Sequence, residues 1–202
     1  RLPVLSDTER ATLAVLPEVR RAIALAQVGQ QHRADQEFDA VNAYDRPGLA
    51  VAMLRLAVDL DLPAAQYRLG RELLYGYSER FDAALYPVPA WRPSDGFEVD
   101  PALLFAVMRR ESEFRAFSSS DAGAQGPMQI MPSTAAYVSG DDAFTGSKKH
   151  LLNDPVVALD LGQDYIDYLL ELNSVRGNLF FALAAYNGGP GNLNKWVEAT
   201  GA

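Results

Sequence analysis

Helix-start signals recur along this chain, each with an acidic residue one or two positions before a proline. They lie at Asp45-Arg46-Pro47, Asp61-Leu62-Pro63, Asp100-Pro101 and Asn153-Asp154-Pro155. A carboxylate accepts the unpaired amides of a first helical turn, and proline pre-sets φ at the first helical position. Ala and Leu dominate the sequence between these signals, and no stretch alternates cleanly between apolar and polar residues. The chain is therefore predicted to be all-α.

Residues 1–80 carry several short helical patterns. A capping box, in which Ser6 and Glu9 bond each other's backbone amides, predicts the first helix start. Further patterns run to about Ala26 and then over residues 33–44, 47–56 and 63–74. Short helices with tight starts favour stacked antiparallel pairs, as in a helical solenoid, and an ordinary helical bundle is the alternative.

Residues 81–99 interrupt the helical pattern. Helix-breaking residues are concentrated there: Pro87, Pro89, Pro93 and Gly96. We expect this Pro-rich connector to contain no helix and to run extended along the surface. It divides the chain into a helical segment at residues 1–80 and a second domain at residues 100–202. In the second domain we expect a loop at 139–150 and helices at about 155–173, 178–186 and from Pro190 onward.

Charge and composition exclude several classes of function. The net charge is −8, the pI is near 4.7, and no basic patch stands out, which argues against nucleic acid and anionic membrane surfaces as partners. No apolar run approaches the length of a membrane span. The chain has no cysteine, and His32 and His150 are isolated, so we expect no disulfide, no metal site and no cofactor.

The helix that begins at Asp100-Pro101 carries a carboxyl group on its apolar side. At 100° per residue one stripe holds these apolar residues: Leu103, Leu104, Val107, Met108 and Phe114. Glu111 lies in the middle of that stripe, while Arg109 and Glu113 lie opposite as an expected i,i+4 ion pair. Burial raises the pKa of a carboxyl, which keeps it protonated and able to donate a proton to a glycosidic oxygen. The alternative is a structural glutamate that arginine or backbone donors satisfy.

A turn of small residues follows, from Ser118 to Gly126, where Gly123 and Gly126 allow close backbone approach. It leads into Met128-Gln129-Ile130-Met131, which is apolar except for one amide. A carboxyl on an apolar stripe, a glycine turn and a glutamine among methionines together predict a functional site.

Three sequence blocks in order carry a resemblance to a known family. They are Glu111-Ser112-x-Phe114, then Ser120-x-x-Gly123-Ala124-x-Gly126-x-Met128-Gln129-Ile130-Met131-Pro132, then Ala185-Tyr186-Asn187-x-Gly189-Pro190-Gly191. Together they resemble the soluble lytic transglycosylases, whose catalytic domain has the goose-type lysozyme-like fold. The resemblance spans about Pro101 to Trp196, and residues 1–80 resemble part of the helical superhelix that precedes this domain in large members. Because the family's domain continues past Trp196, we expect a truncated C-terminus here.

The resemblance implies a role for each matching residue. Glu111 would be the sole catalytic acid and later the base, with Ser112 beside it. Ser120, Gln129 and Met131 would line the glycan groove, and Tyr186 would lie against the catalytic carboxyl. Supporting positions are Ser112, Gly126, Met128 and Asn187. On composition alone Met128 and Met131 would be core residues and Tyr186 a packing aromatic. The chain departs from the family pattern at Pro127, where Leu is usual, and at Gly188, where Ala is common.

The implied activity is cleavage of the MurNAc-β-1,4-GlcNAc bond of peptidoglycan without water. The muramic acid's own 6-hydroxyl would attack C1 and leave a 1,6-anhydromuramic end. Asp121, Asp141 and Asp142 could supply a second carboxylate, but we interpret them as solvated loop residues. The partner would be the glycan strand, in the periplasm or elsewhere in the bacterial envelope.

Two alternative functions remain open. One is a muramidase that hydrolyses the same bond with water. The other is a non-catalytic glycan-binding module whose N-terminal helices contact protein partners. In the favoured interpretation, residues 1–80 position the catalytic domain without taking part in the chemistry.

Overall fold

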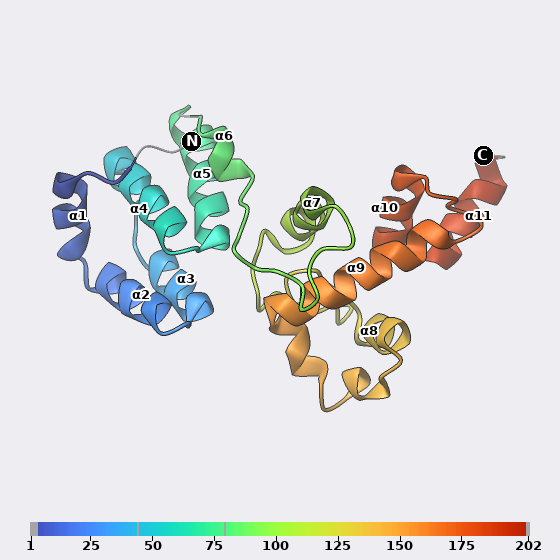
Figure 1. Cartoon of the computed structure of the whole chain (residues 1–202). Coiled ribbons are helices and arrows are strands. Elements are labelled where there is room, and N and C mark those ends of the chain that lie inside the picture. Colours follow the sequence, from blue (N-terminus) through green and yellow to red (C-terminus); the bar gives the residue numbers. More distant parts are fainter. Residues whose placement is uncertain (1–3, 44, 79, 201–202) are drawn as a thin grey trace. The chain divides into compact units, whose positions relative to one another are not determined.

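A computed structural model describes residues 4–43, 45–78 and 80–200. Over these residues the chain forms α-helices, two 3-10 helices and connecting loops, with isolated bridges but no strand (Figure 1). The all-α prediction is confirmed. The α-helices are α1 Asp7–Ala14, α2 Pro17–Gln27, α3 Gln31–Asp39, α4 Pro47–Asp59, α5 Pro63–Tyr77, α6 Asp82–Leu85, α7 Pro101–Ser112, α8 Pro132–Ser139, α9 Pro155–Glu171, α10 Leu179–Gly188 and α11 Pro190–Thr200.

The chain divides into two compact units. Unit 1 comprises Arg1–Trp91 together with Met108–Phe117, and unit 2 comprises Arg92–Val107 together with Ser118–Ala202. The division passes through α7, whose first residues belong to unit 2 and whose last turn belongs to unit 1. The last turn of α7 is thus part of the same compact unit as the N-terminal helices.

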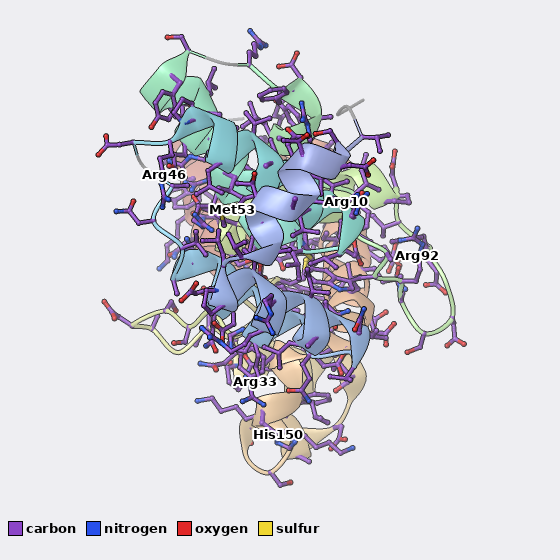
Figure 2. All side chains as sticks on the ribbon, turned by 90° about the vertical axis from the view of Figure 1, so that its left-hand side faces the viewer. Arg10, Arg33, Arg46, Met53, Arg92 and His150 are labelled. Carbon is purple, nitrogen blue, oxygen red and sulfur yellow. The ribbon has the colours of Figure 1, made fainter. Side chains whose placement is uncertain are left out.

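In unit 1 consecutive helices pack as pairs, α2 with α3 and α4 with α5, as expected for a helical-repeat segment. Met53 is fully buried among these helices, whereas Arg10, Arg33 and Arg46 are exposed (Figure 2). The largest fully buried side chains of this core are Leu13, Phe38, Met53, Leu54, Leu62, Leu69 and Leu73. The third helical pattern was expected to reach Tyr44, but α3 ends at Asp39, and Tyr44 lies outside the described residues.

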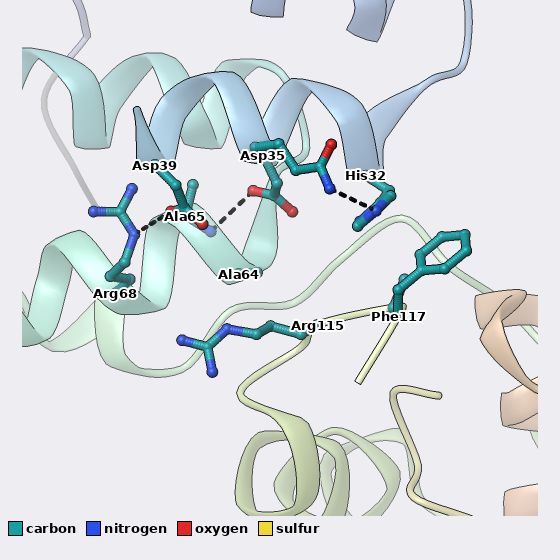
Figure 3. A pocket seen from close by; sticks show the side chains of 10 residues that line it. His32, Asp35, Asp39, Ala64, Ala65, Arg68, Arg115 and Phe117 are labelled. Carbon is teal, nitrogen blue, oxygen red and sulfur yellow. Dashed lines mark hydrogen bonds and ion pairs between the residues drawn. The ribbon is translucent and has the colours of Figure 1, made fainter. Parts of the chain in front are cut away.

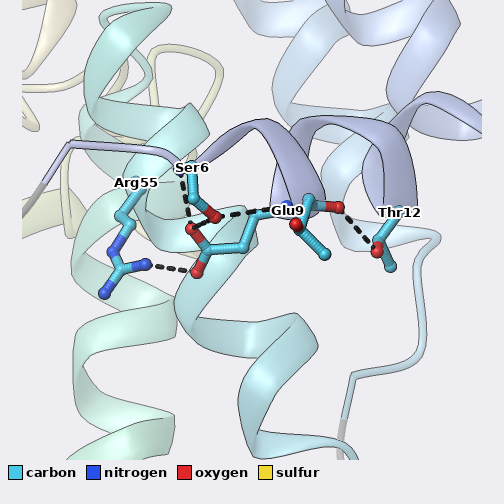
Figure 4. Close-up of polar contacts among 5 residues, drawn as sticks. Ser6, Glu9, Thr12 and Arg55 are labelled. Carbon is cyan, nitrogen blue, oxygen red and sulfur yellow. Dashed lines mark hydrogen bonds and ion pairs between the residues drawn. The ribbon is translucent and has the colours of Figure 1, made fainter.

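The capping box at the first helix is confirmed (Figure 4). The Glu9 backbone amide donates to Ser6 Oγ at 3.3 Å, and the Ser6 amide donates to Glu9 Oε2 at 2.8 Å. The other carboxylate oxygen of Glu9 pairs with Arg55 on α4. Hydrogen bonds from Ser6 are the main cause of a lowered pKa for Glu9. One residue therefore caps α1 and also ties it to α4.

Proline occupies the first position of α4, α5, α7 and α9, but the acidic residue caps only where it directly precedes the proline. Asp100 accepts from Ala102 N at 2.8 Å, and Asp154 accepts from Val156 N at 2.8 Å. In the Asp-x-Pro sequences the acid lies one position too early. Asp61 instead accepts the Ala90 amide at 3.1 Å, which ties the connector to the start of α5.

Two expectations of irregular structure are corrected. The connector does contain a short helix, α6, which packs closely on α5 where Gly70 leaves room for Ala84: a Cβ at Gly70 would lie 2.7 Å from the Ala84 Cβ. The loop expected at 139–150 contains 3-10 helix η1, Asp142–Thr145, and the start of η2, Lys149–Asn153. Short helical turns of this kind need few residues and leave little periodic signal in a sequence.

In unit 2 the long helix α9 packs against α8 and α10, and α10 packs against α11. Their shared core consists of Tyr165, Leu169, Val175, Ala182, Ala185 and Leu193. Ser94 lies before α7 in the chain and is tied to α9. Its backbone amide and its hydroxyl each donate to the Asp160 carboxylate at 2.7 Å. Gly162 of α9 makes room for the Met128 side chain, whose Cε would lie 2.6 Å from a Cβ built at that position.

Candidate active site

Glu111 lies in the last turn of α7 and is half-buried. Burial raises the pKa of its carboxyl above the ordinary value, and the positive charge of Arg110 opposes that effect. The helical part of the apolar stripe predicted around Glu111 is present, since Leu104, Val107 and Met108 are buried. Phe114 is buried as well, but it lies beyond the end of the helix. The carboxyl therefore has the environment that favours its protonated form.

The end of α7 departs from the predicted geometry. Glu113 and Phe114 have left-handed backbones, with φ of 54° and 67°, so the helix stops at Ser112. The expected ion pair between Arg109 and Glu113 is wrong. Glu113 lies beyond the end of the helix, so the two side chains do not have the i,i+4 arrangement that such a pair needs. Glu113 pairs instead with Arg71 of α5 and with Arg115, the latter at 3.3 Å.

Helix α5 holds this part of α7 through aromatic contacts as well. The Phe114 ring meets the edge of Tyr67 at a centroid distance of 6.4 Å. The Arg109 guanidinium lies over Tyr67 at 5.1 Å and over Tyr86 at 4.7 Å. We call Tyr67 and Arg71, with their partners Arg109, Glu113 and Phe114, the α5 clamp. Ser112 is buried within the same turn, where its hydroxyl donates to the Met108 carbonyl at 3.2 Å.

In unit 2 the glycine turn is closed by backbone hydrogen bonds. Gly126 N donates to Ser118 O at 2.8 Å, and Gln125 and Ile130 exchange hydrogen bonds of 3.0 and 3.1 Å. Gly126 is required there, since its φ is +76° and an added Cβ would lie 1.7 Å from the Leu152 carbonyl oxygen. Ser120 is exposed and braces the same turn, with its hydroxyl accepting from Ala124 N at 3.0 Å.

Gln129 also has a left-handed backbone, with φ of +48°. Its Nε2 donates to Ser118 O at 3.1 Å and to Gly126 O at 2.9 Å, so the amide nitrogen holds the turn in place. The hydroxyl of Tyr186 donates to the Met128 carbonyl at 2.8 Å and ties α10 to the same segment. These polar side chains thus fix the geometry of the loop as well as lining its edge.

A pocket of about 250 Å³ lies beside this loop. Its lining residues are Gln129, Ile130, Met131, Thr134, Tyr165, Tyr186, Asn187, Gly188 and Gly189. Four residues predicted from the sequence meet here: Gln129, Met131, Tyr186 and Asn187. Ser120 is not among the lining residues, and Met128 is fully buried against Gly162.

Thr134 and Tyr165 were missed as lining residues. Tyr165 belongs to the buried core of unit 2 as well as to the pocket, so its place in the helical pattern indicates packing and not a site. The position of Thr134 one helical turn after Met131 was a signal that could have identified it, because residues three apart share a helix face.

Unit 1 contains a second pocket that the sequence did not indicate (Figure 3). Asp35 of α3 is mostly buried there and accepts the Ala65 amide, in the first turn of α5, at 3.1 Å. Burial raises its pKa to about 7. His32 stacks on Phe117 at the rim, with ring centroids 4.0 Å apart, and Arg68 pairs with Asp39 at 2.7 Å. The pocket lies between α3, α5 and residues 115–117.

Among the residues that the structure describes, no cluster of His, Asp or Glu side chains is arranged to hold a metal ion. None of the described helices is long and apolar enough to cross a membrane.

Comparison with known proteins decides the family. The model of the transglycosylase SLT domain matches residues 91–202, more than half of the chain. The chain belongs to this family. Among relatives of the SLT family, the soluble lytic murein transglycosylase of Escherichia coli K12 is 34% identical over 107 residues, which cover 52% of this chain and 16% of that protein. A putative soluble lytic murein transglycosylase of Haemophilus influenzae is 30% identical over 145 residues, covering 71% of this chain and 22% of the relative.

Solved structures of the SLT family share the fold. The 70-kDa soluble lytic transglycosylase from Escherichia coli matches 98% of this chain with a TM-score of 0.76 and 23% identity. A complex of the 70-kDa soluble lytic transglycosylase with bulgecin A matches 90% of the chain with a TM-score of 0.71 and 25% identity. The chain spans 32% and 29% of those two structures. The resemblance identified from the three sequence blocks is thus confirmed at the level of family and fold.

Proposed function

We propose that this chain is the lytic transglycosylase part of a peptidoglycan-cleaving enzyme, with Glu111 as its catalytic acid. The observation that carries the proposal is a carboxyl whose pKa is raised by burial, at the position where the sequence resemblance implies the catalytic acid, in a chain of the SLT family. Relatives named murein transglycosylases support peptidoglycan as the substrate and the bacterial envelope as the location.

The proposed reaction needs one carboxyl group. Protonated Glu111 gives its proton to the glycosidic oxygen, and the bond between that oxygen and C1 of the muramic acid breaks. The 6-hydroxyl of the same muramic acid bonds to C1 and returns its proton to the Glu111 carboxylate. The enzyme is regenerated, no water is consumed, and the product is a 1,6-anhydromuramic end. Tethering the 6-hydroxyl to the ring gives it a high effective concentration relative to water.

The other site residues are proposed to hold the sugar. Gln129, Met131, Tyr186 and Asn187 line a pocket of a size that suits one ring, to which Thr134 and Tyr165 are added. Ser120 is proposed to contact the glycan from the glycine turn. Gly126 and Met128 are proposed to support the loop, and Ser112 to support the turn that carries Glu111.

The test combines a variant with an isotope. Glu111→Gln keeps the shape of the side chain but cannot donate an acid proton, so we expect loss of turnover with an unchanged melting temperature. Glu171→Gln, an exposed glutamate on α9, is the matched control and should retain activity. Wild-type digestion of cell-wall sacculi in ¹⁸O-labelled water should give anhydro ends without label.

Each result discriminates between the candidate functions. Incorporation of ¹⁸O at the cleaved ends would replace the proposal with a muramidase. Binding of glycan with no cleavage by the folded wild-type protein would favour a non-catalytic module. A folded Glu111→Gln variant that cleaves at the wild-type rate would remove Glu111 as the acid. Contact of the N-terminal helices with protein partners stays a prediction.

A further inference from the structure

A continuous band of tyrosine rings leads out of the pocket of unit 2. Tyr186 and Tyr165, which both line the pocket, have ring centroids 5.2 Å apart. Tyr165 stacks on Tyr168 at 6.2 Å, and Tyr168 meets Tyr137 edge-to-face at 5.2 Å. The band therefore runs from the pocket across α9 to α8, and its outermost member is Tyr137.

Tyr137 is the exposed end of this band, with 66% of its surface accessible. It lies three residues after the pocket residue Thr134 on α8, so it shares a helix face with Thr134 one turn further from the pocket. The Tyr137 ring packs against Tyr168, and a hydrogen bond between their side chains raises the pKa of Tyr168. An isolated exposed aromatic needs no explanation, but this one packs against Tyr168 and is continuous with a pocket.

We propose that Tyr137 is the platform of an outer sugar-binding subsite, on which the glycan ring next to the pocket stacks. A pyranose ring has a C–H face that suits the electron-rich face of an aromatic ring, and its hydroxyl groups remain in water at the edges. One helical turn, about 5 Å, separates Thr134 from Tyr137, which is a distance comparable to one sugar ring along a strand. A strand with one ring in the pocket therefore meets Tyr137 with a neighbouring ring.

This proposal rests on the proposed glycan substrate. It adds that the protein binds longer glycan strands more tightly than short ones. Short glycans that fill only the pocket do not reach Tyr137, whereas longer strands gain the stacking contact. The subsite thus favours polymeric strands over small fragments.

The experiment measures binding rather than cleavage. Soluble MurNAc–GlcNAc oligomers of increasing length are titrated by calorimetry into Glu111→Gln protein, alone or combined with Tyr137→Ala, Tyr137→Phe or Tyr75→Ala. Tyr75 on α5 is the matched control because it is 78% exposed and lies in the other unit. Tyr137→Ala should weaken binding of the longer oligomers by about 3- to 10-fold, as expected for one aromatic stacking contact, and leave the shortest bound ligand unchanged.

Tyr137→Phe keeps the ring and should bind nearly as the parent, whereas Tyr75→Ala should have no effect at any length. An equal loss on short and long oligomers, or equal losses for the Ala and Phe variants, would overturn the subsite, because Tyr137 would then act through the Tyr168 contact. No loss in Tyr137→Ala, or no binding of any oligomer, would overturn it as well. Length-dependent binding by a wild-type protein that cleaves nothing would support the subsite while refuting the transglycosylase proposal.

Discussion

Arg110 follows Glu111 directly on α7, and its charge opposes the effect of burial on the Glu111 carboxyl. A catalytic acid must be protonated, so activity falls as the pH rises through its pKa. Arg110→Gln removes a positive charge that stabilises the carboxylate, so the pKa of Glu111 should rise further. We expect the alkaline limb of the kcat profile to move to higher pH, whereas Arg20→Gln, another exposed arginine, should leave it in place. A shift to lower pH in Arg110→Gln would contradict this assignment.

Gly123 and Gly126 offer a matched test of the glycine turn. Both have positive φ, 96° and 76°, but a Cβ meets nothing within 4 Å at Gly123 and lies 1.7 Å from the Leu152 carbonyl oxygen at Gly126. Gly123→Ala should cost about 1–2 kcal/mol of unfolding free energy from the backbone conformation alone. Gly126→Ala should cost that amount plus about 1–3 kcal/mol or more from overpacking. Chemical denaturation of both variants measures the difference. Equal losses of unfolding free energy would refute the close approach of Gly126 to the Leu152 carbonyl oxygen.

At the scale of helices, local signals in the sequence predicted the capped and proline-led helix starts, but not the short helices and not which helices pack together. The capping box at Ser6 and the proline starts depend on neighbouring residues, so they could be predicted. The Glu9–Arg55 pair, the use of Asp61 to bind the connector and the packing of Gly70 on α6 depend on residues distant in sequence, and periodicity does not report them.

The same distinction holds within the candidate site. Glu111 lies on a stripe that a helical wheel shows, and the three motif blocks indicated most of the pocket. The failure of the Arg109–Glu113 pair was not predictable, because Glu113 takes a partner on α5, Arg71, that is distant in sequence. The second pocket around Asp35 was missed because its carboxyl caps a different helix.

Asp35 substitutes for the missing cap of α5, whose N-cap residue Leu62 has no polar side chain. Folding raises the pKa of Asp35 from 3.8 to about 7, so the folded state binds its proton more tightly than the unfolded chain does. The contribution of Asp35 to the free energy of unfolding is therefore lost as the pH rises from about 4 to 7. At about 1.4 kcal/mol per pKa unit, the loss is a few kcal/mol.

Asp35→Asn keeps an oxygen acceptor for the Ala65 amide and removes the titration. We expect this variant to be more stable than wild type at pH 8 and closest to it near pH 4, as measured by denaturant midpoints. His32 in the same pocket has a pKa lowered by burial, so its titration makes stability rise with pH. This effect is present in wild type and in Asp35→Asn alike. The difference in stability between the two proteins therefore reports Asp35 alone. Asp45→Asn, an exposed control, should follow wild type. Parallel pH curves for Asp35→Asn and wild type would refute the buried titration.

At the scale of the whole molecule, the α5 clamp changes what the N-terminal helices are expected to do. Residues 1–80 were expected to position the catalytic domain without contributing to the chemistry. The turn that carries Glu111 is held by Tyr67 and Arg71 of α5, so we expect these helices to stabilise the proposed catalytic acid directly.

Loss of the clamp should loosen the end of α7. In the full chain, Arg71→Ala and Tyr67→Ala should speed hydrogen–deuterium exchange over residues 111–117 and lower kcat, whereas Tyr75→Ala on the same helix should change neither. Residues 82–202 expressed alone lack α5, which exposes Phe114 at a cost of about 1.5–3 kcal/mol. That fragment should show the same fast exchange. Slow exchange over residues 111–117 in the fragment would indicate that α5 does not hold them.

The passage of α7 from one unit into the other has a consequence for how such proteins can be recombined. A single crossover near Trp91 would exchange nearly all of unit 2, but it would also import a foreign Met108–Phe117 segment onto these N-terminal helices. The imported segment would need a cation and an aromatic ring on α5 at the positions of Arg71 and Tyr67. Functional chimeras between relatives should therefore inherit α5 and the end of α7 from the same parent.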